Sequence, residues 1–164
     1  MAKKVVIAAD PFGFDLKNYI VQDLRKNGYE VNDLCPDKPM EYQEAAHQVC
    51  KTIQAGEAER GIAICGTGMG VSIVCNKHRG IYAALCQDKW QAERSKTVNN
   101  SNVLCLGGMY TGQIYGAEIA NAWLKAEHLV GIEPAELKDV VKGEFQRIPK
   151  MEEQLYKNDG RDLF

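Results

Sequence analysis

The sequence has no apolar run of the length that a membrane-spanning helix needs, which is about 20 residues. Its first ten residues, MAKKVVIAAD, hold a short apolar stretch that ends at Asp10, so they lack the apolar region and cleavage site of a secretory signal. The chain also lacks an excess of charge, because 20 Lys and Arg stand against 22 Asp and Glu. Nucleic-acid binding needs a basic excess. We therefore expect a cytoplasmic protein with no membrane and no nucleic-acid partner.

Patterns of zinc sites are missing as well. The six cysteines form no C-x-x-C pair and have no histidine at the spacing of a zinc ligand. Four of them lie inside apolar runs, where a free thiol packs as a small hydrophobic side chain: Cys65, Cys75, Cys86 and Cys105. This usage is typical of a reducing compartment and predicts free, mostly buried thiols.

What the sequence does contain is a regular alternation of apolar runs with helical patterns. Strands alternating with helices form parallel sheets that have helices on both faces. We therefore predict an α/β fold in which residues 1–130 form one domain, followed by a helical tail at 131–164 that packs on a partner subunit. The predicted strands are 4–9, 29–35, 61–65, 81–86 and 102–108, and the main predicted helices are 14–28, 42–55, 89–98 and 111–126.

One glycine-rich loop stands out where the third predicted strand ends. Ligands of parallel sheets bind beyond the carboxyl ends of the strands. There the sequence places Cys65-Gly66-Thr67-Gly68-Met69-Gly70, at the start of a predicted helix. A helix start offers free N–H groups and the positive end of the helix dipole, which bind anions and favour the thiolate form of a nearby cysteine.

Three interpretations of this loop compete. It can be an ordinary turn beside a core cysteine. It can be the phosphate loop of a dinucleotide site with Asp88 on the ribose, but its third glycine is one residue early, at Gly70, and only about ten residues lead to the next strand. In the third interpretation, Cys65 is a catalytic base.

Further segments extend the pattern in a fixed order. Asp10-x-x-Gly13 and Tyr42 precede the loop, and it is followed by Val71-Ser72, Asn76-Lys77, Gly80-Ile81, Ala92-Glu93-Arg94-Ser95 and Asn99-Asn100-x-Asn102. From about residue 3 to residue 124, the sequence resembles the ribose-5-phosphate isomerase B and galactose-6-phosphate isomerase family. The resemblance implies a Rossmann-like three-layer α/β/α sandwich with a five-stranded parallel sheet. It also implies a homodimer or homotetramer with active sites shared between subunits, and neither a metal nor another cofactor.

The resemblance also implies roles for individual residues. Cys65 would move a proton between two neighbouring carbons of a small sugar phosphate, through a cis-enediolate. Asp10 and Thr67 would complete the catalytic group, Asp10 by binding hydroxyls and Thr67 by contacting oxygens near C1 and C2. The substrate would be bound by a further set of residues: Gly66, Gly68, Met69, Gly70, Asn99, Tyr42 and Arg147. Some relatives use a glutamate after the loop as the base, and here that stretch is Val71-Ser72.

Three departures from the family pattern bear on the substrate. Pro11 and Val98 stand where the family has histidines, of which the second helps to open the sugar ring, and Met109 stands where a phosphate-binding arginine is common. We therefore hypothesise a substrate that does not cyclise, a tetrose or tetrulose 4-phosphate. The alternatives are a pentose- or hexose-phosphate isomerase, one chain of a two-protein assembly, or a non-catalytic sugar-phosphate-binding subunit. His47 and His78 are interpreted as surface or structural residues.

Overall fold

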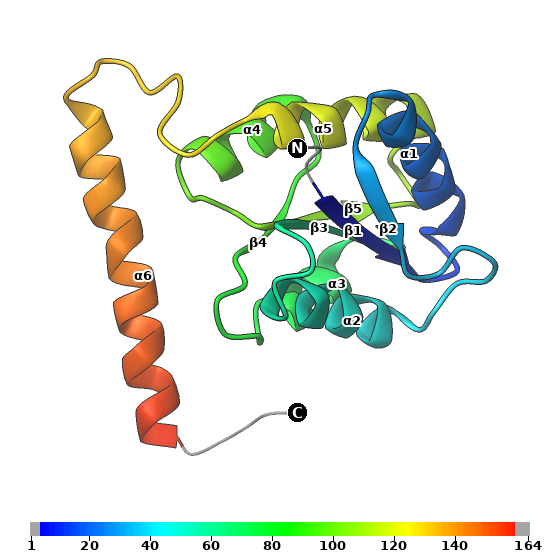
Figure 1. Cartoon of the computed structure of the whole chain (residues 1–164), viewed down its shortest axis with the longest axis horizontal. Coiled ribbons are helices and arrows are strands. Elements are labelled where there is room, and N and C mark those ends of the chain that lie inside the picture. Colours follow the sequence, from blue (N-terminus) through cyan, green and yellow to red (C-terminus); the bar gives the residue numbers. More distant parts are fainter. Residues whose placement is uncertain (1–3, 160–164) are drawn as a thin grey trace.

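The computed structural model describes the backbone of residues 4–159 and the side chains up to residue 156. Strands and helices alternate along it, as Figure 1 shows. The elements are β1 (Lys4–Ala9), α1 (Phe14–Lys26), β2 (Glu30–Asp33), α2 (Tyr42–Gln54), β3 (Arg60–Cys65), α3 (Met69–Cys75), β4 (Ala83–Leu85), α4 (Lys89–Thr97), β5 (Val103–Gly107), α5 (Gln113–Lys125) and α6 (Leu137–Asp159).

The five strands form one parallel sheet in the order β2-β1-β3-β5-β4. Alternate side chains of a strand point to opposite faces, so each central strand feeds two cores. One core joins the sheet to α1, α4 and α5, and the other joins it to α2 and α3. The predicted three-layer α/β/α sandwich is confirmed.

The strand boundaries follow from position in the sheet. The central strand β3 is buried along all six residues, which agrees with its continuous apolar sequence. Strands β2 and β4 lie at the two sheet edges and are shorter than the apolar runs predicted, at 30–33 and 83–85. An edge strand has a neighbour on one side only, so its pairing ends sooner.

Two of the buried cations, Lys17 and Arg60, are held by well-defined partners inside the fold. The Lys17 ammonium is fully buried and donates to the Asp33 carboxylate at 2.7 Å and to the Cys35 carbonyl at 2.9 Å. Arg60, the first residue of β3, donates to the carbonyls of Trp123 and Leu124 at the end of α5, at 3.0 and 2.9 Å. Both charges are paired or hydrogen-bonded, as burial of a charge requires.

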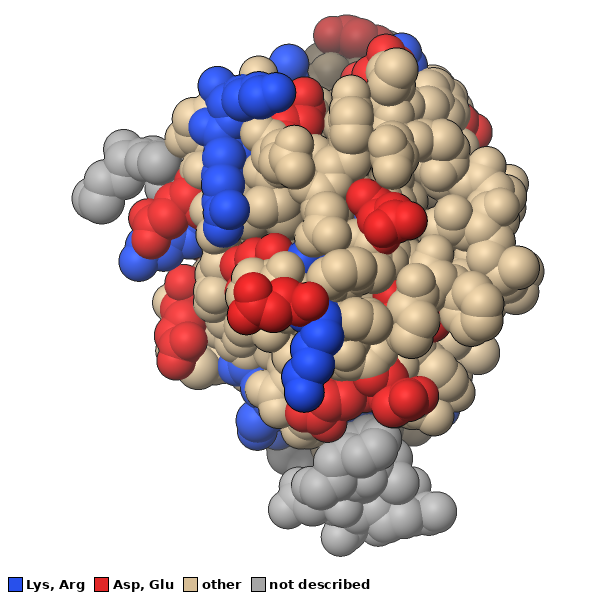
Figure 2. Space-filling model, turned by 90° about the vertical axis from the view of Figure 1, so that its right-hand side faces the viewer, with Lys and Arg blue, Asp and Glu red and all other residues tan. Residues whose placement is uncertain are grey.

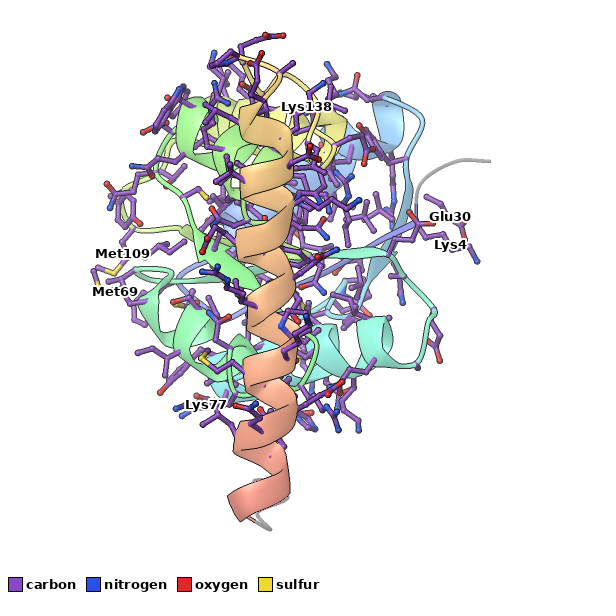
Figure 3. All side chains as sticks on the ribbon, turned by 90° about the vertical axis from the view of Figure 1, so that its left-hand side faces the viewer. Lys4, Glu30, Met69, Lys77, Met109 and Lys138 are labelled. Atoms are coloured by element: carbon purple, nitrogen blue, oxygen red, sulfur yellow. The ribbon has the colours of Figure 1, made fainter. Side chains whose placement is uncertain are left out.

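Helix α6 stands beside the layered body (Figure 1), and none of its residues with described side chains, 137–156, belongs to either core. Its contacts run to the segment before β4. The Glu152 carboxylate accepts hydrogen bonds from the Gly80 N–H at 2.8 Å and the Tyr82 hydroxyl at 3.3 Å, and Phe145 packs edge-on against Tyr82. Figure 3 shows α6 crossing this side of the molecule from Lys138 to the neighbourhood of Lys77.

No helix in the described part of the chain is both long enough and apolar enough to cross a membrane.

Candidate active site

The carboxyl ends of the strands bring the first group of predicted residues together. Cys65 ends β3 and is paired with Gly107 of β5. On the other side of β3, Ala9 is paired with Ile64, so Asp10 follows directly beside Cys65. Figure 2 looks onto the side of the molecule to which the strands point.

Cys65 lies in a backbone cradle made by the glycine loop. Its side chain is 5% exposed, and the N–H of Gly68 donates to its sulfur at 3.1 Å. Gly68 has φ +74°, and a Cβ there would lie 2.9 Å from the carbonyl carbon of Leu106. Only glycine fits this conformation and this space. The backbone thus holds the sulfur at the turn from β3 into α3.

Thr67 and Met69 lie at the exposed rim of the loop. The N–H of Met69 donates to the Thr67 Oγ1 at 3.3 Å, so the threonine hydroxyl keeps its proton for another acceptor. The carbonyl of Thr67 accepts a hydrogen bond from the Tyr110 hydroxyl at 3.1 Å. Tyr42 packs its ring against Gly70, where a Cβ would lie 2.9 Å from the ring.

Asp10 is buried and closes the turn between β1 and α1. Its Oδ1 accepts from the Gly13 N–H at 2.9 Å, and its own N–H donates to the Ile64 carbonyl at 3.0 Å. These bonds fix the carboxylate at the edge of the sheet next to Cys65. The arrangement serves the turn itself and is also compatible with binding a substrate hydroxyl.

The sequence did not point to Phe12 or Tyr110 at this edge. Met109 was named only as a replacement for an arginine, and its contact with the loop was not expected. A Cβ on Gly66 would lie 3.0 Å from the Met109 sulfur and 3.4 Å from the Phe12 Cβ, so both residues flank the loop. Phe12 is 66% exposed and Met109 is 68% exposed. Figure 3 shows Met69 and Met109 projecting from the same flank of the molecule. The signal that could have indicated these residues is an apolar side chain in the turn after a predicted strand.

Asn99 and Arg147 lie elsewhere. Asn99 precedes β5, so it lies at the amino edge of the sheet, whereas Cys65 lies at the carboxyl edge. The five residues of β5 separate the two edges by about 16 Å. Asn99 and Arg147 share a groove of about 470 Å³ between the end of α4 and α6, which Val98 and Phe145 also line. One chain therefore holds the predicted residues as two groups.

Other candidate residues have structural roles. Asp88 caps α4 by accepting from the Gln91 N–H at 2.8 Å, which favours a structural role over ribose binding. His47 and His78 contact each other, with 2.8 Å between the ring nitrogens, and burial lowers the pKa of His78.

The remaining thiols are buried, and the pKa is raised for four of them: Cys35, Cys50, Cys75 and Cys86. Hydrogen bonding to Cys75 and burial raise the pKa of Cys50, and burial raises the pKa of Cys86 to about 11. Such thiols are inert packing groups. Within residues 4–159, no cluster of three His, Cys, Asp or Glu side chains could hold a metal ion.

Several known sugar isomerases are similar to this chain. A 4-deoxy-4-sulfo-D-erythrose isomerase of Clostridium sp. (strain MSTE9) is 39% identical over 157 residues, which cover 94% of this chain and 98% of the relative. A D-erythrulose-4-phosphate isomerase of Pectobacterium atrosepticum is 40% identical over 126 residues, covering 75% of this chain and 83% of the relative. The solved ribose-5-phosphate isomerase B of Clostridium thermocellum superposes with a TM-score of 0.83 at 34% identity, covering 93% of this chain and 99% of that one.

The family model described as Ribose/Galactose Isomerase matches residues 5–139, a span that includes the whole layered body and every residue of the carboxyl-edge group. The chain therefore belongs to the ribose/galactose isomerase family.

Proposed function

We propose that this protein is an aldose–ketose isomerase whose substrate is a four-carbon sugar with an anionic group on C4, the tetrose and tetrulose 4-phosphates being the simplest examples. The observation that carries the proposal is the Gly68 N–H donated to the Cys65 sulfur at 3.1 Å, at the mouth of a glycine loop. That contact makes Cys65 the best-placed base at the carboxyl edge. Two relatives that are named for four-carbon substrates support the chain length.

The chemistry follows from the loop. The Cys65 thiolate removes the proton on C2 of the aldose, and the electron pair moves into an enediolate whose negative charge lies on O1. Return of the same proton to C1, with movement of the hydroxyl proton from O2 to O1, yields the ketose. The Met69 N–H donates to the Thr67 hydroxyl, whereas the N–H groups of Gly70 and Val71 have no acceptor within the helix and would stabilise the enediolate oxygen. The Thr67 hydroxyl keeps its own proton and would donate it to O1 or O2.

The absence of a ring-opening group supports a substrate that does not cyclise. His47 and His78 lie on α2 and just after α3, away from this edge. His128, after α5, packs edge-on against Phe145 and is not among the residues that line the groove. Pro11 stands in the turn beside Asp10, and Val98 stands at the opposite edge. A tetrose needs O4 to close a furanose ring, and a phosphate on O4 prevents closure. General acid–base groups contribute about 10²- to 10⁴-fold where a proton must move, so a ring substrate would be handled poorly.

The separation of the two residue groups supports a shared site. Asn99 and Arg147 cannot reach Cys65 of their own chain across the length of β5. In a homodimer or homotetramer, the groove of one subunit would face the carboxyl edge of another, and α6 would pack at that contact. The proposal therefore includes a homodimer or homotetramer with shared active sites. It also places the protein in the cytoplasm.

The test is deuterium exchange at C1 and C2, followed by NMR in D₂O with erythrose 4-phosphate, erythrulose 4-phosphate and ribose 5-phosphate. We expect exchange with a four-carbon substrate. Cys65→Ser, which keeps the shape but is a far weaker base, should lower the rate by at least about 10³-fold. Cys105→Ala is the matched control, since it removes a thiol from the same sheet face and should retain exchange. Faster turnover of ribose 5-phosphate would overturn the chain length, and full activity of Cys65→Ser would overturn the mechanism.

A further inference from the structure

The carboxyl edge offers an anion few positive charges. The turns that follow the five strands carry four carboxylates, those of Asp10, Asp37, Glu41 and Asp88, and one ammonium group, that of Lys38. Lys38 follows β2, two strands away from β3, which is about 10 Å. The turns after β3 and β5, which surround Cys65, carry no charged side chain.

Cations at the starts of the helices do not change this balance. Lys17 is fully buried and paired with Asp33. Lys89, at the start of α4, is paired with Glu118 at 2.9 Å. Figure 2 shows the result as a broad area without Lys or Arg in the right half of the view.

The side chains that do stand beside the loop are apolar. Phe12 and Met109 flank Gly66 and expose about two thirds of their surface, at 66% and 68%. Phe12 and Met109 form the apolar side of the rim next to the loop, and Thr67 and Met69 lie on another part of it. A substrate whose C2 contacts the Cys65 sulfur, and whose C4 end extends over Phe12 and Met109, meets an apolar wall.

The charge of an anion determines how much it costs to bring that anion from water to an apolar wall. The cost of removing an ion from water rises with the square of its charge, so a dianion pays roughly four times the cost of a monoanion. A phosphate monoester carries about −1.5 to −2 at neutral pH, because its second pKa is about 6. A sulfonate carries −1 at any ordinary pH, has the same three tetrahedral oxygens, and when bonded directly to C4 leaves no O4 for ring closure.

We propose that the C4 group of the substrate is a sulfonate, and that Phe12 and Met109 are the residues that select it over a phosphate. This inference rests on the proposed isomerase function and deepens it. Arg147 of a second copy is itself paired with Glu144 at 3.0 Å, so it offers an anion no more than one positive charge, which suits a monoanion better than a dianion.

The test compares kcat/KM for 4-deoxy-4-sulfo-D-erythrose and D-erythrose 4-phosphate at pH 7.5. We expect the wild-type protein to prefer the sulfonate by at least about ten-fold. Met109→Arg should shift the ratio toward the phosphate by at least about ten-fold, while Met109→Leu, the apolar matched control, should leave it unchanged. Phe12→Arg tests the same wall from the other side of Gly66 if Met109→Arg does not fold.

A pH series gives an independent readout. As the pH falls from 7.5 to about 5.5, the phosphate becomes a monoanion, so the wild-type preference for the sulfonate should shrink. Equal or better turnover of the phosphate at pH 7.5 would overturn the inference and leave the isomerase function standing. An unchanged ratio in folded Met109→Arg and Phe12→Arg would also overturn it. Exchange with neither substrate would overturn the proposed function itself.

Discussion

Gly68 is the residue on which the position of the thiol depends most directly. Its N–H donates to the Cys65 sulfur, and its left-handed backbone turns the chain from β3 into α3. Both properties come from the backbone, yet both need the side chain to be absent, because a Cβ would meet Leu85 and the backbone of Leu106.

A matched pair of glycine variants separates these effects. Gly56 has nearly the same φ, +75°, with nothing near the place of a Cβ. We expect Gly56→Ala to lower the free energy of unfolding by about 1–2 kcal/mol, the ordinary cost of a left-handed residue. Gly68→Ala should cost more than this and also lower kcat. Urea unfolding and the exchange assay measure the two quantities, and equal losses in both variants would show that the close contact at Gly68 is unimportant.

Single residues also show how far the sequence could be read. The strand-to-helix position of the loop predicted that Cys65 would lie at a helix start next to Asp10. The flanking positions of Phe12 and Tyr110 could not be predicted, because they depend on how the turns after β1 and β5 fold onto Gly66 and Thr67. Spacing along the chain carries no information on that contact.

Between elements, the pair formed by His47 of α2 and His78, just after α3, makes the packing of these helices sensitive to acid. Burial lowers the pKa of His78 first of all, and the neighbouring His47 and Lys51 act in the same direction. The fold therefore favours the neutral ring, whereas the unfolded chain takes up a proton at the ordinary pKa near 6.5.

We expect the free energy of unfolding to fall as the pH drops below about 6.5, with a slope of at most about 1.4 kcal/mol per pH unit from His78. His128, whose pKa burial also lowers, adds to the slope. Urea midpoints at pH 7.5, 6.5 and 5.5 measure it. His78→Gln should flatten the dependence, and a slope equal to that of the wild type would refute the assignment.

Elements were predicted best where burial was complete. The apolar run at 4–9 matched β1 residue for residue, and β3 was predicted to within one residue. The edge strands were predicted too long, because apolar residues continue past the point where pairing stops. The role of Arg60 as a cap on α5 could not be predicted from the sequence, because the carbonyls that it binds are more than sixty residues away along the chain.

At the scale of the whole molecule, the important fact is that the two residue groups lie at opposite edges of one sheet. Family resemblance named Cys65 and Asn99 together, but only the parallel pairing of β3 with β5 shows that one chain holds them at opposite edges of the sheet. The 131–164 tail remains a predicted partner contact. Its helix leaves Val140, Met151 and Leu155 exposed at 54–60%.

Mixing two inactive variants tests the shared site. Cys65→Ala and Asn99→Ala should each be nearly inactive alone. After unfolding and refolding together, half of the dimers would carry one variant of each kind, and each such dimer would hold one intact site. Activity should return to about a quarter of the wild-type value. A mixture of the Cys65→Ala and Arg147→Ala variants, refolded together, should regain activity in the same way. No recovery from mixed dimers would place all the functional residues in one chain.

The hydrogen bonds of Arg60 help to hold β3, and with it Cys65, in a fixed position. They fasten the first residue of β3 to the end of α5, while the carbonyls of Cys65 and Gly66 at its other end accept the N–H groups of Gly108 and Met109. The strand is thus clamped at both ends and cannot follow a substrate. The movements that a turnover requires must therefore come from the sugar and from the exposed side chains around it. The Cys65 sulfur keeps its position, and C2 and then C1 of the sugar must move to it.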